Sequence, residues 1–338
     1  METSNKITKV ETSEVVVSEN GQTLNDLLEL FVRLIPNVKD SSRYQYKKDL
    51  TIFFDWVSES GRIISSLTPL DIISFQKHLE NKGLSPLTIG SYLISIRRFF
   101  EWTDANGLYK NIAKGIKSPQ RLKKFQKKAL KDEQSRDLLE YYQGKKPRDF
   151  AIVNLILRTG LRTIEVTRAN VSDIDYIGGR RVLKVWGKGK LVGDKNTDFV
   201  VLSDKAYKPI ENYLKTRGRV NKNEPLFVTN RGRKRVSIEG NSVEGYQGEK
   251  EYERLTTRTV SKICKTALEG IGLTGDSYTA HSLRHTTGCT IIRHNGTLED
   301  VQFVLRHSSV KTSEIYLESI KEERRLENAP ELLLDSVF

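Results

Sequence analysis

Side chains that can act on an anionic group stand at short spacings in the second half of the chain. His281 and Arg284 are three residues apart in HSLRHT, so a helix would place both on one face. His307 and Tyr316 are nine residues apart, which on one unbroken helix would put them on opposite faces. The serine pair at 308–309 predicts a helix break with a new N-cap. With that break, the two side chains can converge.

A further pair stands upstream in TGLRTIEV, where Glu165 follows Arg162 by one helical turn. Taken singly, each of these features has an ordinary structural explanation. An HxxR pattern is commonly structural, Tyr316 between Ile315 and Leu317 fits a half-buried core tyrosine, and Arg162 with Glu165 fits a surface ion pair. A chemical interpretation therefore depends on the combination of these residues.

A phosphodiester is the substrate that joins these residue types. Attack at phosphorus builds charge on two non-bridging oxygens, which suits two arginines because each guanidinium donates bidentately and stays protonated. A tyrosine hydroxyl can serve as covalent nucleophile, a lysine at a hairpin tip can protonate the departing 5′ oxygen, and histidines can transfer protons or bond the phosphate. Such a site needs no metal, and the sequence offers no carboxylate cluster to hold one.

The elements that must position these residues fall into two regions. Residues 22–113 predict a domain of about four helices, and residues 1–21 a flexible lead-in. One predicted helix starts at Thr68-Pro69 with Asp71 at N3 and stops at Gly83, and the next starts at Ser85-Pro86. That next helix carries one apolar face, formed by Ile89, Tyr92, Leu93, Ile96, Phe99 and Phe100.

Residues 132–320 predict a second, α+β domain. Its first part, to about residue 172, is helical, with an apolar run ended by Gly160. Short strands follow at 182–186 and 199–202 around a Gly-Lys-Gly turn, and residues 230–255 predict an insertion or a hairpin arm. Helical patterning resumes from about Thr257, and residues 321–338 form a C-terminal tail.

The charge balance points to a polyanionic partner. The 338 residues include 56 Lys and Arg against 43 Asp and Glu, a net charge of +13. A basic linker over residues 114–131 holds eight of these cations and no acid, and would run as a strap along a phosphate backbone. No stretch reaches the roughly 18 apolar residues of a membrane span, no secretory signal is visible, and the two cysteines lack metal-site spacing. We therefore expect a cytoplasmic protein without a cofactor or metal and without membrane attachment.

Four segments in order, TGLRTIEV, WGKGK, HSLRHT and LRHSSVKTSEIY, resemble the tyrosine site-specific recombinases of the phage-type integrase and Xer family. The resemblance covers the whole second domain, and the helical domain before it is similar to that family's core-binding domain. It implies a mainly α fold with a small sheet, in which the two domains form a C-shaped clamp on duplex DNA. It also implies exchange of strands between two DNA sites by a homotetramer.

Carried over position by position, the resemblance assigns the catalytic roles. Tyr316 would be the nucleophile, and Arg162 and Arg284 would hold the scissile phosphate. The supporting roles would fall to Lys188 as general acid, His281 as assisting base, His307 as phosphate ligand and Glu165 as orienting acid.

Two positions depart from the family pattern. Arg306 stands where the family usually has glycine, and either adds a phosphate contact or alters the local backbone. Lys190 lies two residues after Lys188, which leaves the choice of hairpin lysine open. The DNA-contact candidates are Arg97, Arg98, Lys114, Lys117, Arg121, Lys123, Lys124, Lys127, Lys128, Lys190 and Arg306.

Two other functions stay open at this point. A type IB topoisomerase would use the same residue set to relax DNA, and a non-catalytic DNA-binding or architectural protein would use HxxR and Tyr316 structurally. The tail after Tyr316 is net acidic and ends in apolar residues, so we expect it to dock on a neighbouring protomer, or else to fold back as an intramolecular helix. Accessory proteins are possible, and their identity is unknown.

Overall fold

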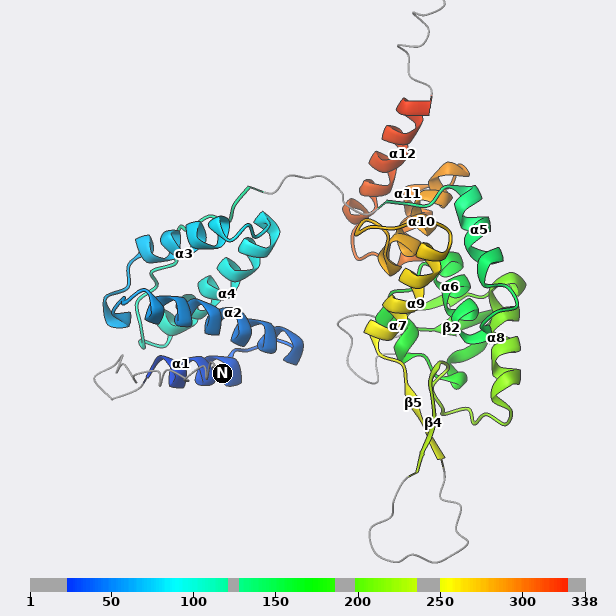
Figure 1. Cartoon of the computed structure of the whole chain (residues 1–338), viewed down its shortest axis with the longest axis horizontal. Helices are drawn as coiled ribbons and strands as arrows, with labels where there is room; N and C mark the ends of the chain where they lie inside the picture. The colour runs from blue at the N-terminus through cyan, green and yellow to red at the C-terminus, as the bar shows by residue number, and fades with distance from the viewer. Residues whose placement is uncertain (1–22, 121–127, 186–197, 236–249, 328–338) are drawn as a thin grey trace, which may run out of the picture. The chain divides into compact units, whose positions relative to one another are not determined.

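The computed structural model describes residues 23–120, 128–185, 198–235 and 250–327. The chain divides into two compact units, Met1–Lys123 and Lys124–Phe338 (Figure 1). Within the described residues, no helix is both long and apolar enough to cross a membrane.

In the residues that the structure describes, the first unit consists of four α-helices and one short 3-10 turn around an aromatic core. These elements are α1 (Leu24–Leu34), α2 (Asp40–Glu59), η1 (Ile64–Ser66), α3 (Pro69–Asn81) and α4 (Pro86–Ala105). The predicted helix starts are confirmed: the Asp71 carboxylate accepts from the Thr68 backbone N–H at 2.8 Å, and the Ser85 hydroxyl accepts from the Thr88 N–H at 3.2 Å. The apolar face of α4 is buried, except for the half-buried Tyr92.

The described part of the second unit contains the other helices and two small antiparallel sheets. Its helices are α5 (Asp132–Tyr142), α6 (Pro147–Thr159), α7 (Thr163–Arg168), η2 (Val171–Asp173), α8 (Asp204–Arg217), α9 (Thr257–Gly270), α10 (Ala280–Arg293), α11 (Leu298–Leu305), η3 (Val310–Thr312) and α12 (Glu314–Glu327). Its strands are β1 (Ile174–Ile177), β2 (Arg180–Lys184), β3 (Phe199–Val201), β4 (Val228–Arg235) and β5 (Lys250–Arg254).

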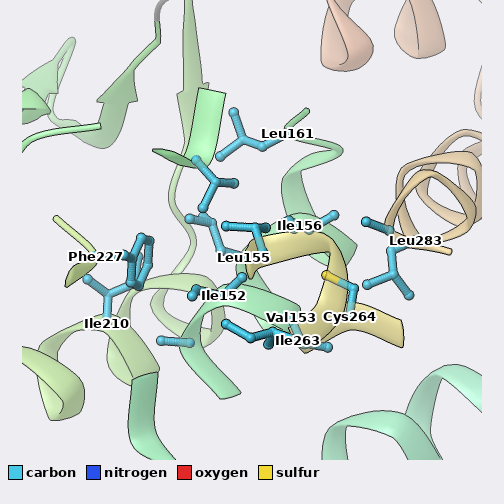
Figure 2. Close-up of a cluster of buried hydrophobic side chains, with 14 of the residues drawn as sticks. Ile152, Val153, Leu155, Ile156, Leu161, Ile210, Phe227, Ile263, Cys264 and Leu283 are labelled. Carbon is cyan, nitrogen blue, oxygen red and sulfur yellow. The ribbon is translucent and has the colours of Figure 1, made fainter. Parts of the chain in front are cut away.

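The apolar run of α6 forms the centre of this unit's core. Ile152, Val153, Leu155 and Ile156 are fully buried and pack against α8, α9 and α10 (Figure 2). Gly160 ends α6 with a left-handed backbone at φ 62°, which is the helix end that the sequence predicted. Because the core fixes α6 and α10 side by side, it also fixes the segment that follows α6.

The two predicted strands at 182–186 and 199–202 are present as β2 and β3 and pair antiparallel, with Leu183 opposite Val200. A third strand, β1, pairs with β2 and was not expected, because its four residues are too few to show alternation. Residues 186–197, which hold the Gly-Lys-Gly turn between β2 and β3, lie outside the described residues.

Of residues 230–255, the described parts include two paired strands, and residues 236–249 lie outside the described residues. β4 and β5 pair antiparallel and project from the helices (Figure 1), and the register is irregular between Val228 and Arg233. At the base of the hairpin, the Arg254 guanidinium donates to the carbonyls of Thr167 at 2.7 Å and Ala169 at 3.0 Å. The hairpin is thereby attached to the C-terminal end of α7.

Candidate active site

The site is assembled from segments that stand far apart in the sequence. Arg162 is the N-cap of α7, and Glu165 lies on its first turn. Arg284 belongs to α10, His307 follows α11, and Tyr316 lies on the first turn of α12. His281 is exposed on the first turn of α10. The predicted break between His307 and Tyr316 is confirmed, because η3 separates α11 from α12.

Arg284 is the structural centre of this arrangement. Its side chain is buried, and its two terminal nitrogens donate to the carbonyls of Gly160 and Leu305. These bonds connect the turn before Arg162 to the end of the helix before His307. Burial and the nearby Arg162 charge lower the pKa of Arg284 to about 10, against the opposing effect of Glu165. The guanidinium therefore stays charged at neutral pH.

Arg162 and Glu165 form a half-buried pair rather than a surface one. Arg162 Nη1 donates to Glu165 Oε1 at 2.9 Å, and the Arg162 backbone N–H donates to Oε2 at 2.8 Å. Glu165 is 1% exposed, whereas the Arg162 side chain is 32% exposed. The carboxylate thus orients a guanidinium that still reaches the surface of the unit.

His307 is held by the segment that carries the tyrosine. Its Nδ1 lies 2.9 Å from the hydroxyl of Ser313, and the Ser313 carbonyl accepts from the Tyr316 backbone N–H at 3.1 Å. Burial, followed by the charges of Arg284 and Arg162, lowers the pKa of His307 to about 4. The imidazole is therefore neutral at physiological pH and has one N–H to donate.

Tyr316 lies among other side chains instead of facing solvent. It is 4% exposed, its ring stacks on His307 with centroids 5.9 Å apart, and the His285 ring lies 4.9 Å away. A Cβ on Gly288 would stand only 2.6 Å from Tyr316 Cδ1, so α10 needs glycine at this contact. Burial raises the pKa of the Tyr316 hydroxyl, while Arg284 and Arg162 act in the opposite direction.

The sequence analysis did not identify two residues that contribute to the site. His285, next to Arg284 in HSLRHT, is buried against Tyr316, and burial lowers its pKa to about 4. Ser313 is fully buried and joins His307 to the start of α12. Adjacency to Arg284 was a usable signal for His285, whereas a serine three residues before a tyrosine is not distinctive.

The structure distributes the predicted DNA-contact residues unevenly. Lys114, Lys117, Lys128 and Arg98 are exposed, and Arg98 lies 3.8 Å from Glu101. Arg97, expected to face solvent or DNA, instead donates to the Ile116 carbonyl and the Ser118 hydroxyl, both at 3.1 Å. Lys188 and Lys190, like Arg121, Lys123, Lys124 and Lys127, lie outside the described residues.

Arg306 does not project into solvent. Its side chain is 7% exposed, and its Nη2 lies 2.6 Å from Glu165 Oε2. The guanidinium is thus turned towards a buried carboxylate.

Comparison with known proteins places both units in one family. The model of the phage integrase family matches residues 128–323, and the model of the phage integrase N-terminal SAM-like domain matches residues 28–107. A tyrosine recombinase XerC of Corynebacterium glutamicum is 30% identical over 243 residues, which cover 70% of this chain and 69% of the relative. A tyrosine recombinase XerD of Oceanobacillus iheyensis is 26% identical over 296 residues, covering 85% of this chain and 90% of the relative.

Solved structures share the fold. The XerH site-specific recombinase bound to a palindromic difH substrate, in a post-cleavage complex, superposes with a TM-score of 0.65 at 19% identity, covering 92% of this chain and 86% of that one. A lambda integrase (75–356) dimer bound to a COC′ core site gives a TM-score of 0.63 at 14% identity, covering 87% of this chain and 95% of that one.

Proposed function

Since the chain belongs to the phage integrase family of tyrosine recombinases, enzymes that cleave and rejoin DNA at specific sites, we propose a role for each side chain of its site. Tyr316 attacks the scissile phosphorus and forms a 3′-phosphotyrosyl bond as a 5′ hydroxyl leaves. The bond energy stays in the covalent link. A 5′ hydroxyl from a partner site then reverses the step and joins the strands, without ATP or a metal.

The two arginines stabilise the charge that develops on the phosphate. Arg162 is oriented by Glu165 and has an exposed portion that can face DNA, and Arg284 supplies a second, buried positive charge. The single observation that carries this proposal is the pair of bonds from Arg284 to Gly160 and Leu305. They bring three separate sequence motifs to one place, which scattered structural residues would not require.

His281 and His307 complete the set as assisting base and phosphate ligand. A neutral His307 can donate one hydrogen bond to a phosphate oxygen, and its stacking on Tyr316 places it beside the nucleophile. On DNA binding, α12 shifts relative to α10 and brings the hydroxyl of Tyr316, a residue that is 4% exposed, to the phosphate. DNA binding supplies the free energy for this shift in our proposal.

Lys188 is proposed as the general acid that protonates the leaving 5′ oxygen. Its sequence position, between β2 and β3, matches the family's hairpin lysine, and Lys190 is the alternative.

Duplex DNA is the proposed partner, bound by the basic linker and by the exposed cations around it. Phosphate contacts from such residues give affinity with strong salt dependence and fix no base sequence. We further propose that the enzyme acts in the cytoplasm as a homotetramer on two sites. In that assembly the C-terminal tail contacts a neighbouring protomer.

A strand-exchange assay tests the function. Two duplexes that carry the same candidate site but different end labels are incubated with the full chain, and recombinant products are separated by size. We expect products that carry both labels. Relaxation of supercoiled DNA without any label exchange would favour the topoisomerase alternative, and binding without cleavage would favour the architectural one.

A further inference from the structure

We propose that Arg306 is a positioning residue for the cleavage step: through Glu165 it holds the Arg162 guanidinium in place, and it does not itself contact DNA. The inference rests on the proposed role of Arg162 at the scissile phosphate.

The backbone at Arg306 is one that arginine does not favour. The residue ends α11 with φ 53° and ψ 52°, in the left-handed region, and its N–H donates to the Phe303 carbonyl at 3.2 Å. Glycine is the usual residue at such a helix end because a Cβ is disfavoured there. An arginine at this position needs a side-chain interaction that offsets the backbone cost.

The Arg306 side chain makes that interaction with a buried carboxylate of the second unit. Arg306 Nη2 lies 2.6 Å from Glu165 Oε2, and Nη1 donates to the Val304 carbonyl at 2.8 Å. The Arg306 side chain is 7% exposed and Glu165 is 1% exposed. A guanidinium in this position is bound to a buried carboxylate and is withdrawn from the surface where a DNA phosphate would lie.

Glu165 is shared between the two arginines. Its Oε1 accepts from Arg162 Nη1 at 2.9 Å, and its Oε2 accepts from the Arg162 backbone N–H at 2.8 Å as well as from Arg306. Charge-assisted bonds of this kind fix the plane of the carboxylate. The carboxylate in turn fixes the direction of the Arg162 side chain, whose outer part is exposed.

Arg306 also closes a ring of contacts around the site. Its neighbour Leu305 accepts from Arg284, and its other neighbour, His307, contacts Ser313. Three consecutive residues are thus bound to Arg284, Glu165 and the segment before Tyr316. Loss of the Arg306 guanidinium would release Glu165 from this ring and allow Arg162 to change direction. A displacement of about 1 Å in a positioning group can lower a rate up to about 10²-fold.

The variants R306G, R306K, E165Q and R306G/E165Q of the full chain provide the test. Glycine suits the left-handed backbone, so R306G removes the guanidinium without adding strain. Two quantities are measured on a nicked duplex with a candidate site: the dissociation constant with its salt dependence, and the single-turnover cleavage rate at saturating DNA. Thermal melting monitors folding.

We expect R306G to bind DNA within about twofold of the parent, with the same salt slope, and to cleave about 10- to 100-fold more slowly. R306K keeps a positive charge beside Glu165 and should cleave faster than R306G. Because both changes act through one carboxylate, R306G/E165Q should cleave no more slowly than E165Q alone.

Other outcomes overturn the proposal. Weaker binding with a shallower salt slope, and a rate loss that adds to that of E165Q, would make Arg306 a direct phosphate contact. A lower melting temperature with an unchanged cleavage rate would make it only structural. These results are separate from failure of the proposed function, which would appear as unchanged cleavage when Tyr316 itself is replaced by phenylalanine.

Discussion

At the scale of the residue, burial lowers the pKa of two histidines and one arginine of the site. His285 and His307 both have a pKa lowered to about 4, and the Arg284 pKa is lowered to about 10. At neutral pH this leaves neutral imidazoles beside Tyr316 and a charged guanidinium behind them. A neutral His307 keeps one N–H, which it can donate to a phosphate oxygen.

The lowered histidine pKa values predict a pH-dependent stability. In the unfolded chain a histidine binds a proton below about pH 6.5, whereas buried His285 stays neutral down to about pH 4. As the pH falls from 6.5 to 4, the unfolded state binds more protons and the free energy of unfolding decreases. H285Q, which is neutral throughout, should lose less stability than the parent over this range, as measured by urea unfolding.

His78 provides the matched control for this measurement. It lies in the first unit, on α3, so H78Q removes a histidine from outside the site, and the slope of H285Q is compared with that of H78Q as well as with that of the parent. Equal slopes for H285Q and the parent would contradict the assigned state of His285.

Lys188 has its own test at this scale. A 5′-bridging phosphorothioate has a thiolate leaving group that needs no proton. K188A should therefore cleave an ordinary phosphodiester on the order of 10²-fold more slowly and cleave the thio substrate at close to the parental rate. K190A should cleave both substrates at close to the parental rate. If K190A instead cleaves the ordinary substrate slowly and the thio substrate at close to the parental rate, the general acid is Lys190.

At the scale of the element, the site depends on how α6, α10 and α11 meet. Gly160 is the point of contact: its left-handed backbone ends α6, its carbonyl accepts from Arg284, and a Cβ there would collide with Leu305 at the end of α11. The turn that leads to Arg162 is therefore in direct contact with the helix that leads to His307.

Replacing this glycine should damage both stability and catalysis. G160A adds strain at φ 62° and a collision with Leu305, and should lower the free energy of unfolding by on the order of 1–3 kcal/mol. G272A is the control, because Gly272 has φ 79° and nothing within 4 Å of an added Cβ. G272A should lose only the strain contribution and keep the parental cleavage rate. Equal losses in both variants, measured by thermal melting and single-turnover cleavage, would refute the contact at Gly160.

Many of the helix boundaries were predictable from the sequence. Caps at Thr68 and Ser85, the end of α6 at Gly160 and the break after His307 all follow from local backbone chemistry. Strand β1 was not predictable because it is short and depends on pairing with β2. The pairing of Arg306 with Glu165 spans 141 residues of sequence, and the ring contacts of Tyr316 with His285 and His307 join separate elements. No local pattern encodes these contacts.

At the scale of the whole molecule, the proposed assembly of protomers depends on the C-terminal tail. Each of the two units has its own hydrophobic core, and the acidic, apolar tail over residues 321–338 begins within α12, the helix that carries Tyr316. A tail docked on a neighbouring protomer would connect that neighbour to the position of the nucleophile.

Removal of residues 325–338 tests this connection. The truncated chain should bind a single site with the parental dissociation constant, because the tail is net acidic and contributes no phosphate contacts. Its complexes with two sites should be strongly reduced in a native-gel synapsis assay. Intact synapsis after truncation would instead favour a tail that folds back on its own protomer.

The central claim is that Tyr316 forms a covalent bond with DNA. The most direct measurement is covalent trapping on a nicked duplex with a candidate site, followed by mass spectrometry of the attached peptide. Y142F is a matched control, since Tyr142 is also 4% exposed but belongs to the core around α6. We expect the parent and Y142F to form the adduct at Tyr316, and Y316F to bind the same DNA and form none. An adduct that persists in Y316F, or one mapped to another residue, would contradict the account.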